Sequence, residues 1–222
     1  MVMPVITFPT VLTDSYSMLL IPEFSTYVAQ KNYIAIHYIS NKIFKFTCAF
    51  SVCVSSIFLF FSNDLGLVIY NNLETGFYFK ALAPLVFFMY MDHIIDCILK
   101  GLNKQFGVMC CNILDLSITT CFIYFLLPVW GINGYIASIL FSEILNFSVS
   151  LFQLIKYSKI KIHFIDWVLV PLICSLLSYF IISVLHFTFI DMIMNLVFNI
   201  CLFILYFFMI FIGINKLFNK NN

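Results

Sequence analysis

Ionisable side chains are grouped in one long apolar stretch of the sequence, at residues 78–99 and its border. Asp92, Asp96 and Lys100 follow one another at intervals of four residues, so a helix would place them on one face, with His93 beside them. Charged groups inside a membrane helix cost about 2.5–3.5 kcal/mol each and mark functional positions. Two interpretations stay open: this face lines a polar path, or it lies near the membrane surface, where Lys100 reaches water.

Two further apolar stretches also carry a polar face. Asn112, Asp115 and Thr119 share one side of a helix at residues 106–127. The stretch at 132–155 has a polar face formed by Ser142, Glu143, Asn146, Ser150 and Gln153. Such faces either join helices through hydrogen bonds or surround a hydrated cavity. We favour a shared hydrophilic interior, and the candidate substrate or ion pathway comprises Asp92, His93, Asp96, Lys100, Asn112, Asp115 and Glu143.

The same residues make a weak case for an enzyme or a metal centre. His93 with Asp92 and Asp96 is an incomplete ligand set, and no nucleophile motif or glycine-rich phosphate loop accompanies it. Asp96 and Lys100 stand instead in the favourable order for an ion pair along a helix. The eight cysteines lie in apolar stretches without a C-x-x-C pair, which predicts small buried hydrophobes. We expect no catalysis, no metal and no cofactor.

Composition identifies the setting of these faces. Of the 222 residues, 63% are hydrophobic and 9% are charged, and the mean hydropathy is +1.06. A water-soluble chain of this size could not hide so much apolar surface. The net charge of +1 argues against nucleic acid as a partner. The bilayer is therefore the expected partner.

Seven stretches are each about long enough to cross the hydrocarbon core as a helix. They lie at residues 2–21, 43–61, 78–99, 106–127, 132–155, 166–185 and 191–214. Their continuous apolar character favours helices over barrel strands. Pro128, Gly131 and Gly134 predict a tight turn between the fourth and fifth stretches. The predicted fold class is an all-α integral membrane protein with about seven transmembrane helices.

The lysines predict the orientation of these helices. All 11 basic residues are Lys, and 10 of them fall in alternate connections. The four connections carry Lys31, Lys42 and Lys45, then Lys100 and Lys104, then Lys156, Lys159 and Lys161, then Lys216 and Lys220; Lys80 is the exception. By the positive-inside rule, the N-terminus is extracytoplasmic and the C-terminus is cytoplasmic. Because Met1 opens directly into an apolar stretch, we expect the chain to be the second part of a longer protein.

Three blocks of sequence resemble a known family. They are FPTVLTDSYSMLLIPEFS at 8–25, YMDHIIDCILKGLNKQ at 90–105 and LLPVWGINGYIASILFSE at 126–143. The chain resembles the polysaccharide-biosynthesis, stage V sporulation protein B-like branch of the multidrug/oligosaccharidyl-lipid/polysaccharide (MOP) exporter superfamily. Lipid II flippases and MATE drug exporters are members of that superfamily.

The resemblance implies about fourteen helices in two six-helix lobes plus a final pair, with this chain as the second half. Residues 1–185 would be the second lobe without its first helix, and residues 186–222 the final transmembrane helix and a short cytoplasmic tail. The implied activity, in the cytoplasmic membrane, is translocation of a lipid-linked oligosaccharide or peptidoglycan precursor. A lipid-linked saccharide and a missing N-terminal lobe would then be partners.

Two alternatives remain beside this interpretation. One is a MATE-type, cation-coupled drug exporter of the same fold, and the other is a non-transporting membrane scaffold or an inactive gene fragment. One departure bears on the substrate: lipid II flippases use arginines for the pyrophosphate, and this sequence contains no Arg. Lysine is a point charge without the bidentate geometry of arginine.

Overall fold

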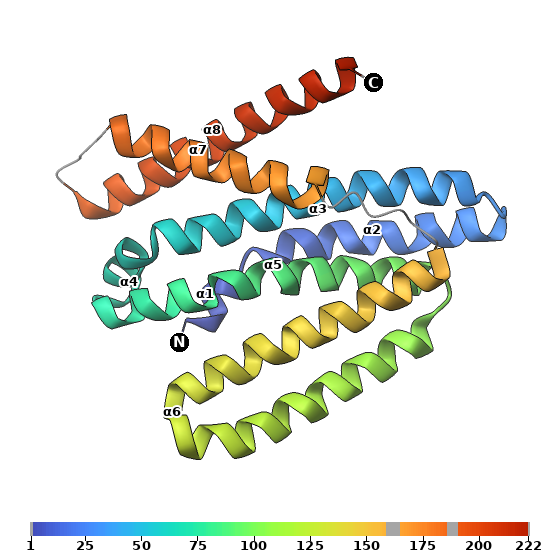
Figure 1. Cartoon of the computed structure of the whole chain (residues 1–222), viewed down its shortest axis with the longest axis horizontal. Helices are drawn as coiled ribbons and strands as arrows, with labels where there is room; N and C mark the ends of the chain where they lie inside the picture. Colours follow the sequence, from blue (N-terminus) through green and yellow to red (C-terminus); the bar gives the residue numbers. More distant parts are fainter. Residues whose placement is uncertain (1, 159–164, 186–190, 222) are drawn as a thin grey trace. The chain divides into compact units, whose positions relative to one another are not determined.

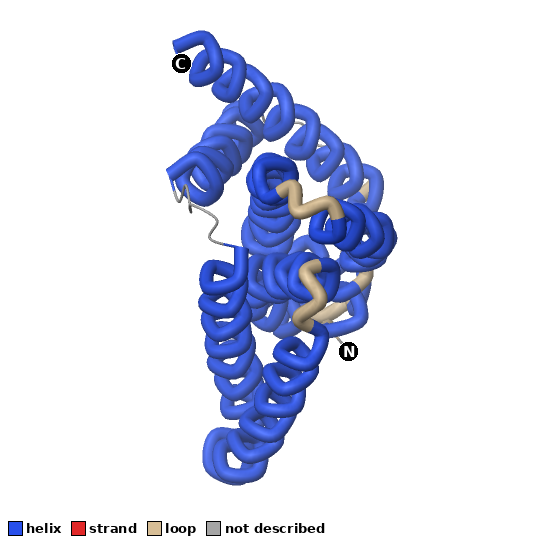
Figure 2. The backbone as a smooth tube through the Cα atoms, turned by 90° about the vertical axis from the view of Figure 1, so that its right-hand side faces the viewer, coloured by secondary structure: helices blue, strands red, loops and turns tan. Residues whose placement is uncertain are grey.

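The computed structural model describes residues 2–158, 165–185 and 191–221. The helices are α1 (Met3–Thr7), α2 (Thr10–Ala29), α3 (Tyr33–Phe60), α4 (Ser62–Tyr70), α5 (Leu73–Gly101), α6 (Gln105–Ser158), η1 (Ile165–Leu169), α7 (Val170–Leu185) and α8 (Met192–Asn221). The described residues form helices and short turns and contain no strand (Figure 2). The all-α prediction is therefore confirmed. Lys159, Lys161 and the predicted domain boundary at residue 186 lie outside the described residues.

Six helical segments within the described residues are long and apolar enough to cross a membrane. Seven were predicted, and the difference arises in α6, which is one helical run of 54 residues. Its backbone is non-helical at Gly131, where φ is 58° and ψ is −137°, so two helices meet there. The two arms of α6 fold back on one another as a hairpin (Figure 1). The predicted turn between residues 128 and 134 is confirmed.

The first two connections are much shorter than the sequence predicted. The predicted connection at 22–42 is wrong, because α2 continues through Pro22 to Ala29 and α3 already begins at Tyr33. Lys42 and Lys45 consequently lie within α3. The side-chain oxygen of Asn32 accepts a hydrogen bond from the Ala35 amide at 3.1 Å, which caps the start of α3. The predicted connection at 62–77 is largely replaced by α4 and the start of α5.

The chain divides into two compact units, and α3 and α5 contribute to both. Unit 1 contains α1, residues 48–83, η1, α7 and α8. An aromatic cluster joins its helices: Phe60 stacks on Tyr179 at 4.1 Å between ring centroids, and Phe61 meets Phe203 edge to face at 6.0 Å. The Ser55 hydroxyl donates to the Ala83 carbonyl at 2.7 Å. Aromatic contacts and a hydrogen bond from a side chain to the backbone thus join the helices of unit 1.

Unit 2 contains α2, residues 33–47 of α3, residues 84–101 of α5, and α6. Its core is formed by fully buried side chains of α2 and α5, among them Phe24, Tyr90 and Ile94. At Gly101 the two helices approach so closely that an added Cβ would lie 2.5 Å from Cβ of Phe24. The Ser25 hydroxyl also donates to the Gly101 carbonyl at 3.3 Å. The C-terminal ends of α2 and α5 therefore lie together.

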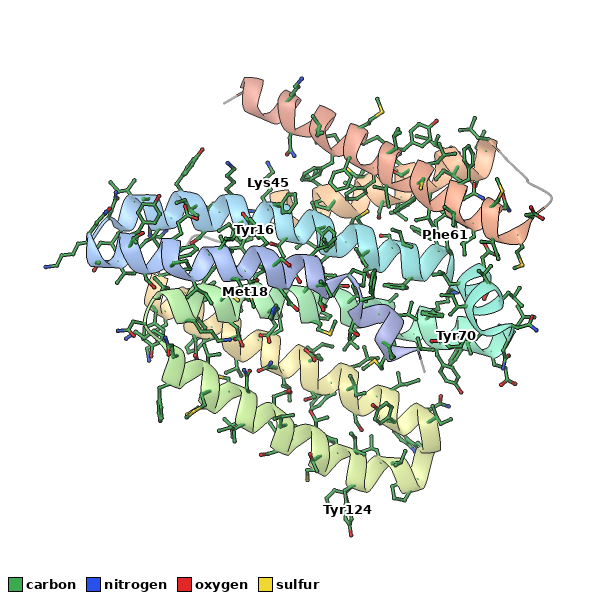
Figure 3. The ribbon with its side chains drawn as sticks, turned by 180° about the vertical axis from the view of Figure 1, so that it is seen from behind. Tyr16, Met18, Lys45, Phe61, Tyr70 and Tyr124 are labelled. Carbon is green, nitrogen blue, oxygen red and sulfur yellow. The ribbon has the colours of Figure 1, made fainter. Side chains whose placement is uncertain are left out.

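Large apolar side chains project outward from many helices. Met18 on α2 and Tyr124 on α6 are each 75% exposed, and Tyr124 points away from its helix (Figure 3). All eight cysteines have free thiols, and five are buried as predicted. The prediction is wrong for Cys121 and Cys201, which are exposed on these apolar faces. Long apolar helices with apolar exteriors fit a multi-pass membrane protein.

Candidate functional site

The two acids of α5 are buried against the α6 hairpin. Asp92 is 8% exposed, and its Oδ2 accepts a hydrogen bond from Nδ2 of Asn146 at 2.8 Å. Asp96 is 6% exposed, and its Oδ2 accepts from Nδ2 of Asn112 at 3.2 Å. Asn112 lies on the first arm of α6 and Asn146 on the second. One face of α5 therefore contacts both arms of the hairpin.

Buried oxygen atoms on α5 and α6 have hydrogen-bonding capacity that the described residues do not fully use. Oδ1 of Asp96 and Oε1 of Gln153 have no hydrogen-bond partner there, and the Ser150 hydroxyl lies beside the Asp92 carboxylate without the geometry of a well-formed hydrogen bond. Leaving a buried polar group unpaired costs about 1–3 kcal/mol, and native structures contain few such groups. A proton, a water molecule or the hydroxyl of a ligand would satisfy them. The interface thus has capacity to bind a polar species.

A second set of contacts joins the two arms of α6. The Ser142 hydroxyl donates to Oδ1 of Asp115, and because it has one proton, Thr119 must donate to Ser142. Nearer the open end of the hairpin, Nε2 of Gln153 donates to the Cys111 sulfur at 2.9 Å. A cleft of about 80 Å³ lies between the arms, lined by Cys111, Leu114, Asp115, Ile118, Leu145, Asn146 and Val149. The volume is enough for a few water molecules.

Three of the predicted site residues form no side-chain hydrogen bond to this interface among the described residues. Nε2 of His93 lies 2.5 Å from Oδ1 of Asp14 on α2, and the two side chains are 40% and 44% exposed. Among the described residues, Lys100 has no oxygen of Asp96 within 4.0 Å, although its charge acts on that carboxylate, and Oδ2 of Asp96 accepts from the amide of Asn112 instead. Glu143 is half-buried, without a side-chain hydrogen bond in the described part of the chain.

Sequence reasoning missed three partners that the structure supplies. The sequence indicates Asn146 and Ser142 only as members of a polar face, of which Glu143 is the predicted site residue. Sequence spacing does not connect Asp14 with His93, although an acid inside an apolar helix is itself a signal. The described residues contain no group of three or more His, Cys, Asp or Glu side chains placed to hold a metal ion. Amides and carboxylates facing one another therefore define the site.

A buried polar interface between long apolar helices fits a multi-pass membrane protein in which polar groups serve a specific task. The chain is a sequence homologue of the stage V sporulation protein B of Bacillus subtilis (strain 168), with 25% identity over 182 residues. The match covers 79% of this chain and 35% of the relative, so the chain spans about a third of the relative's length. This homology confirms the resemblance seen in the sequence. No family model matches the chain. No solved structure matches it either.

Proposed function

We propose that the chain is the C-terminal part of a membrane flippase that translocates a lipid-linked oligosaccharide or peptidoglycan precursor across the cytoplasmic membrane. The observation that carries this proposal is the interface of α5 with α6, where the buried carboxylates of Asp92 and Asp96 each meet an amide of α6 and Asp96 keeps one buried oxygen unpaired. Homology to stage V sporulation protein B supports it. No covalent bond is made or broken in this activity.

The chemistry of the interface suits a sugar head group. Sugar hydroxyls both donate and accept hydrogen bonds, and the interface offers carboxylate acceptors on Asp92, Asp96 and Asp115 with amide donors on Asn112 and Asn146. The head group would pass along these polar faces while the lipid tail stays in hydrocarbon. Pairing between protein groups satisfies part of the hydrogen-bonding capacity of these faces when no substrate is bound.

The proposed topology counts seven membrane spans, with the two arms of α6 crossing separately. It places the chain on helices eight to fourteen of a MOP-type transporter, with residues 1–185 in the second lobe and a separate N-terminal lobe as partner. Two contacts bring lysine-bearing segments of unit 2 to the same end of the unit. The Ser25 hydroxyl of α2 donates to the Gly101 carbonyl at the end of α5, and Nζ of Lys104 lies 4.5 Å from the ring centroid of Tyr157. We assign this end to the cytoplasm.

A hybrid protein tests the proposal in cells. In a Bacillus subtilis strain without stage V sporulation protein B, residues of this chain replace the matched segment of the relative, and spores are counted. The hybrid should restore spore formation, and Asp92→Asn or Asp115→Asn should impair it without loss of membrane insertion. Glu74→Gln is the matched control, because Glu74 is an exposed acid at the other end of α5. Full activity of both aspartate variants would contradict the assignment of the pathway.

A further inference from the structure

Two lysines meet at one tyrosine ring at the open end of the α6 hairpin. Nζ of Lys104 lies 4.5 Å from the ring centroid of Tyr157, and Nζ of Lys156 lies 5.8 Å from the same centroid. Lys104 immediately precedes α6, and Lys156 lies in its last turn. All three side chains are exposed. The start and the end of the hairpin therefore present two positive charges around one aromatic ring.

These charges have no counter-charge from the described part of the chain. Neither lysine has a carboxylate within 4.0 Å among the described residues. Lys100 adds a third positive charge at the end of α5. The acid of α2 at this end of unit 2 is Glu23, which is the residue before Phe24, and Phe24 packs against Gly101. Attraction to the ring faces offsets part of the repulsion between two ammonium groups, but it leaves their net charge unchanged. An anion bound between them would relieve this repulsion.

The length of the hairpin arms places this cluster at the membrane surface. The first arm runs from Gln105 to the turn at Gly131 and spans roughly 39 Å at 1.5 Å per residue. The hydrocarbon core is about 30 Å thick, so the ends of the arm extend into the head-group layer. Tyrosine is enriched at that depth, and lysine is a common ligand of phosphate there. The anion available in that layer is the phosphate of an anionic phospholipid.

We propose that Lys104, Lys156 and Tyr157 form a binding site for the head group of an anionic phospholipid. The phosphate would bridge the two ammonium groups and so tie the start of the hairpin to its end. That bridge would add to the Cys111–Gln153 hydrogen bond, which joins the same two arms farther along. The site is separate from the contacts of Asp92 and Asp96, and its existence does not depend on transport.

Lipid titration of the full chain tests the site. The purified chain in neutral detergent is titrated with phosphatidylglycerol or phosphatidylcholine, and the rise in melting temperature gives the apparent Kd. Phosphatidylglycerol should stabilise the chain and phosphatidylcholine should not. One lysine near a charged membrane surface contributes about a fivefold change in affinity. Lys104→Gln and Lys156→Gln should therefore each weaken binding about fivefold, and the double variant should bind more weakly than either single variant.

Matched variants separate the site from general surface charge. Lys31→Gln removes an exposed lysine from the α2–α3 turn and should leave the Kd within about twofold. Lys104→Arg keeps the charge and should retain binding, which also shows that the position tolerates substitution. An equal loss in Lys31→Gln and Lys104→Gln would overturn the site, as would equal stabilisation by the two lipids. Stabilisation by inorganic phosphate at the same concentration would overturn the lipid as the occupant.

Discussion

Replacing Asn146 with alanine removes the amide that donates to Oδ2 of Asp92 and leaves this oxygen of the buried side chain without a partner. The cost of an unpaired buried polar group is about 1–3 kcal/mol, and more when the group is charged. The interaction energy of the pair itself is smaller, since hydrogen bonds between membrane helices average about 0.6 kcal/mol and reach about 1.7 kcal/mol. Most of the loss in Asn146→Ala should thus come from the acid that remains.

A double-mutant cycle separates these two contributions. The full chain in detergent is unfolded thermally as wild type, Asn146→Ala, Asp92→Ala and the double variant. The coupling energy should fall between about 0.6 and 1.7 kcal/mol, with the double variant more stable than the sum of the single losses predicts. Asn199→Ala is the matched control and should cost less than about 0.5 kcal/mol, because Asn199 pairs with Asn195 on its own helix. Additive losses at Asn146 and Asp92 would refute the hydrogen bond.

Gly101→Ala and Asp14→Asn probe contacts within unit 2, and Gly213→Ala in unit 1 is the control for the glycine substitution. Gly101→Ala should destabilise the chain by about 1–3 kcal/mol, since the new Cβ would lie 2.5 Å from Cβ of Phe24, whereas Gly213→Ala should be neutral or stabilising because no atom lies within 4 Å. Thermal unfolding of both variants checks this, and the reverse order would contradict the close approach. Asp14→Asn should cost less than about 1 kcal/mol in the same assay, because Asp14 and His93 are about half exposed. A larger loss would mean that this pair is a main link of α2 to α5.

The sequence identified the acidic face of α5 but not its partners. Intervals of four residues fix Asp92 and Asp96 on one face of any helix, and the structure shows both buried on that face. Which amides meet them depends on how α5 packs against each arm of α6, and sequence spacing carries no information on that register. The sequence predicts Glu143 as the site residue of one polar face, whereas in the structure Asn146 of the same face donates to Asp92.

A stripe of small polar residues could have indicated the choice on the second arm of α6. Ser138, Ser142 and Ser150 are buried, and they lie at multiples of four residues from Asn146. Residues at that spacing share a helix face, and Glu143, three residues before Asn146, lies at the edge of that face. Small residues at regular intervals also let membrane helices approach closely. The stripe therefore indicates which face of the arm packs inward.

Helix ends were the least predictable feature of the fold. The predicted apolar stretches end at the first polar residues, but the helices continue to residues with left-handed backbone angles. Three such residues follow helices: Lys31 after α2, Asn71 after α4 and Asn103 after α5, with φ of 53°, 50° and 62°. Asparagine tolerates this conformation better than most residues, so Asn71 and Asn103 carried a readable signal. Lys31 did not, because lysine has no such preference.

The most direct test of the central proposal is translocation of a lipid-linked oligosaccharide in reconstituted vesicles. The chain is joined to the preceding part of its sporulation relative, and movement of a fluorescent precursor across the bilayer is timed. We expect faster movement than in protein-free vesicles, a slower rate for the Asp92→Asn, Asp96→Asn double variant, and an unchanged rate for Glu74→Gln. Equal rates for the wild-type chain and the double aspartate variant would contradict the polar interface as the substrate path.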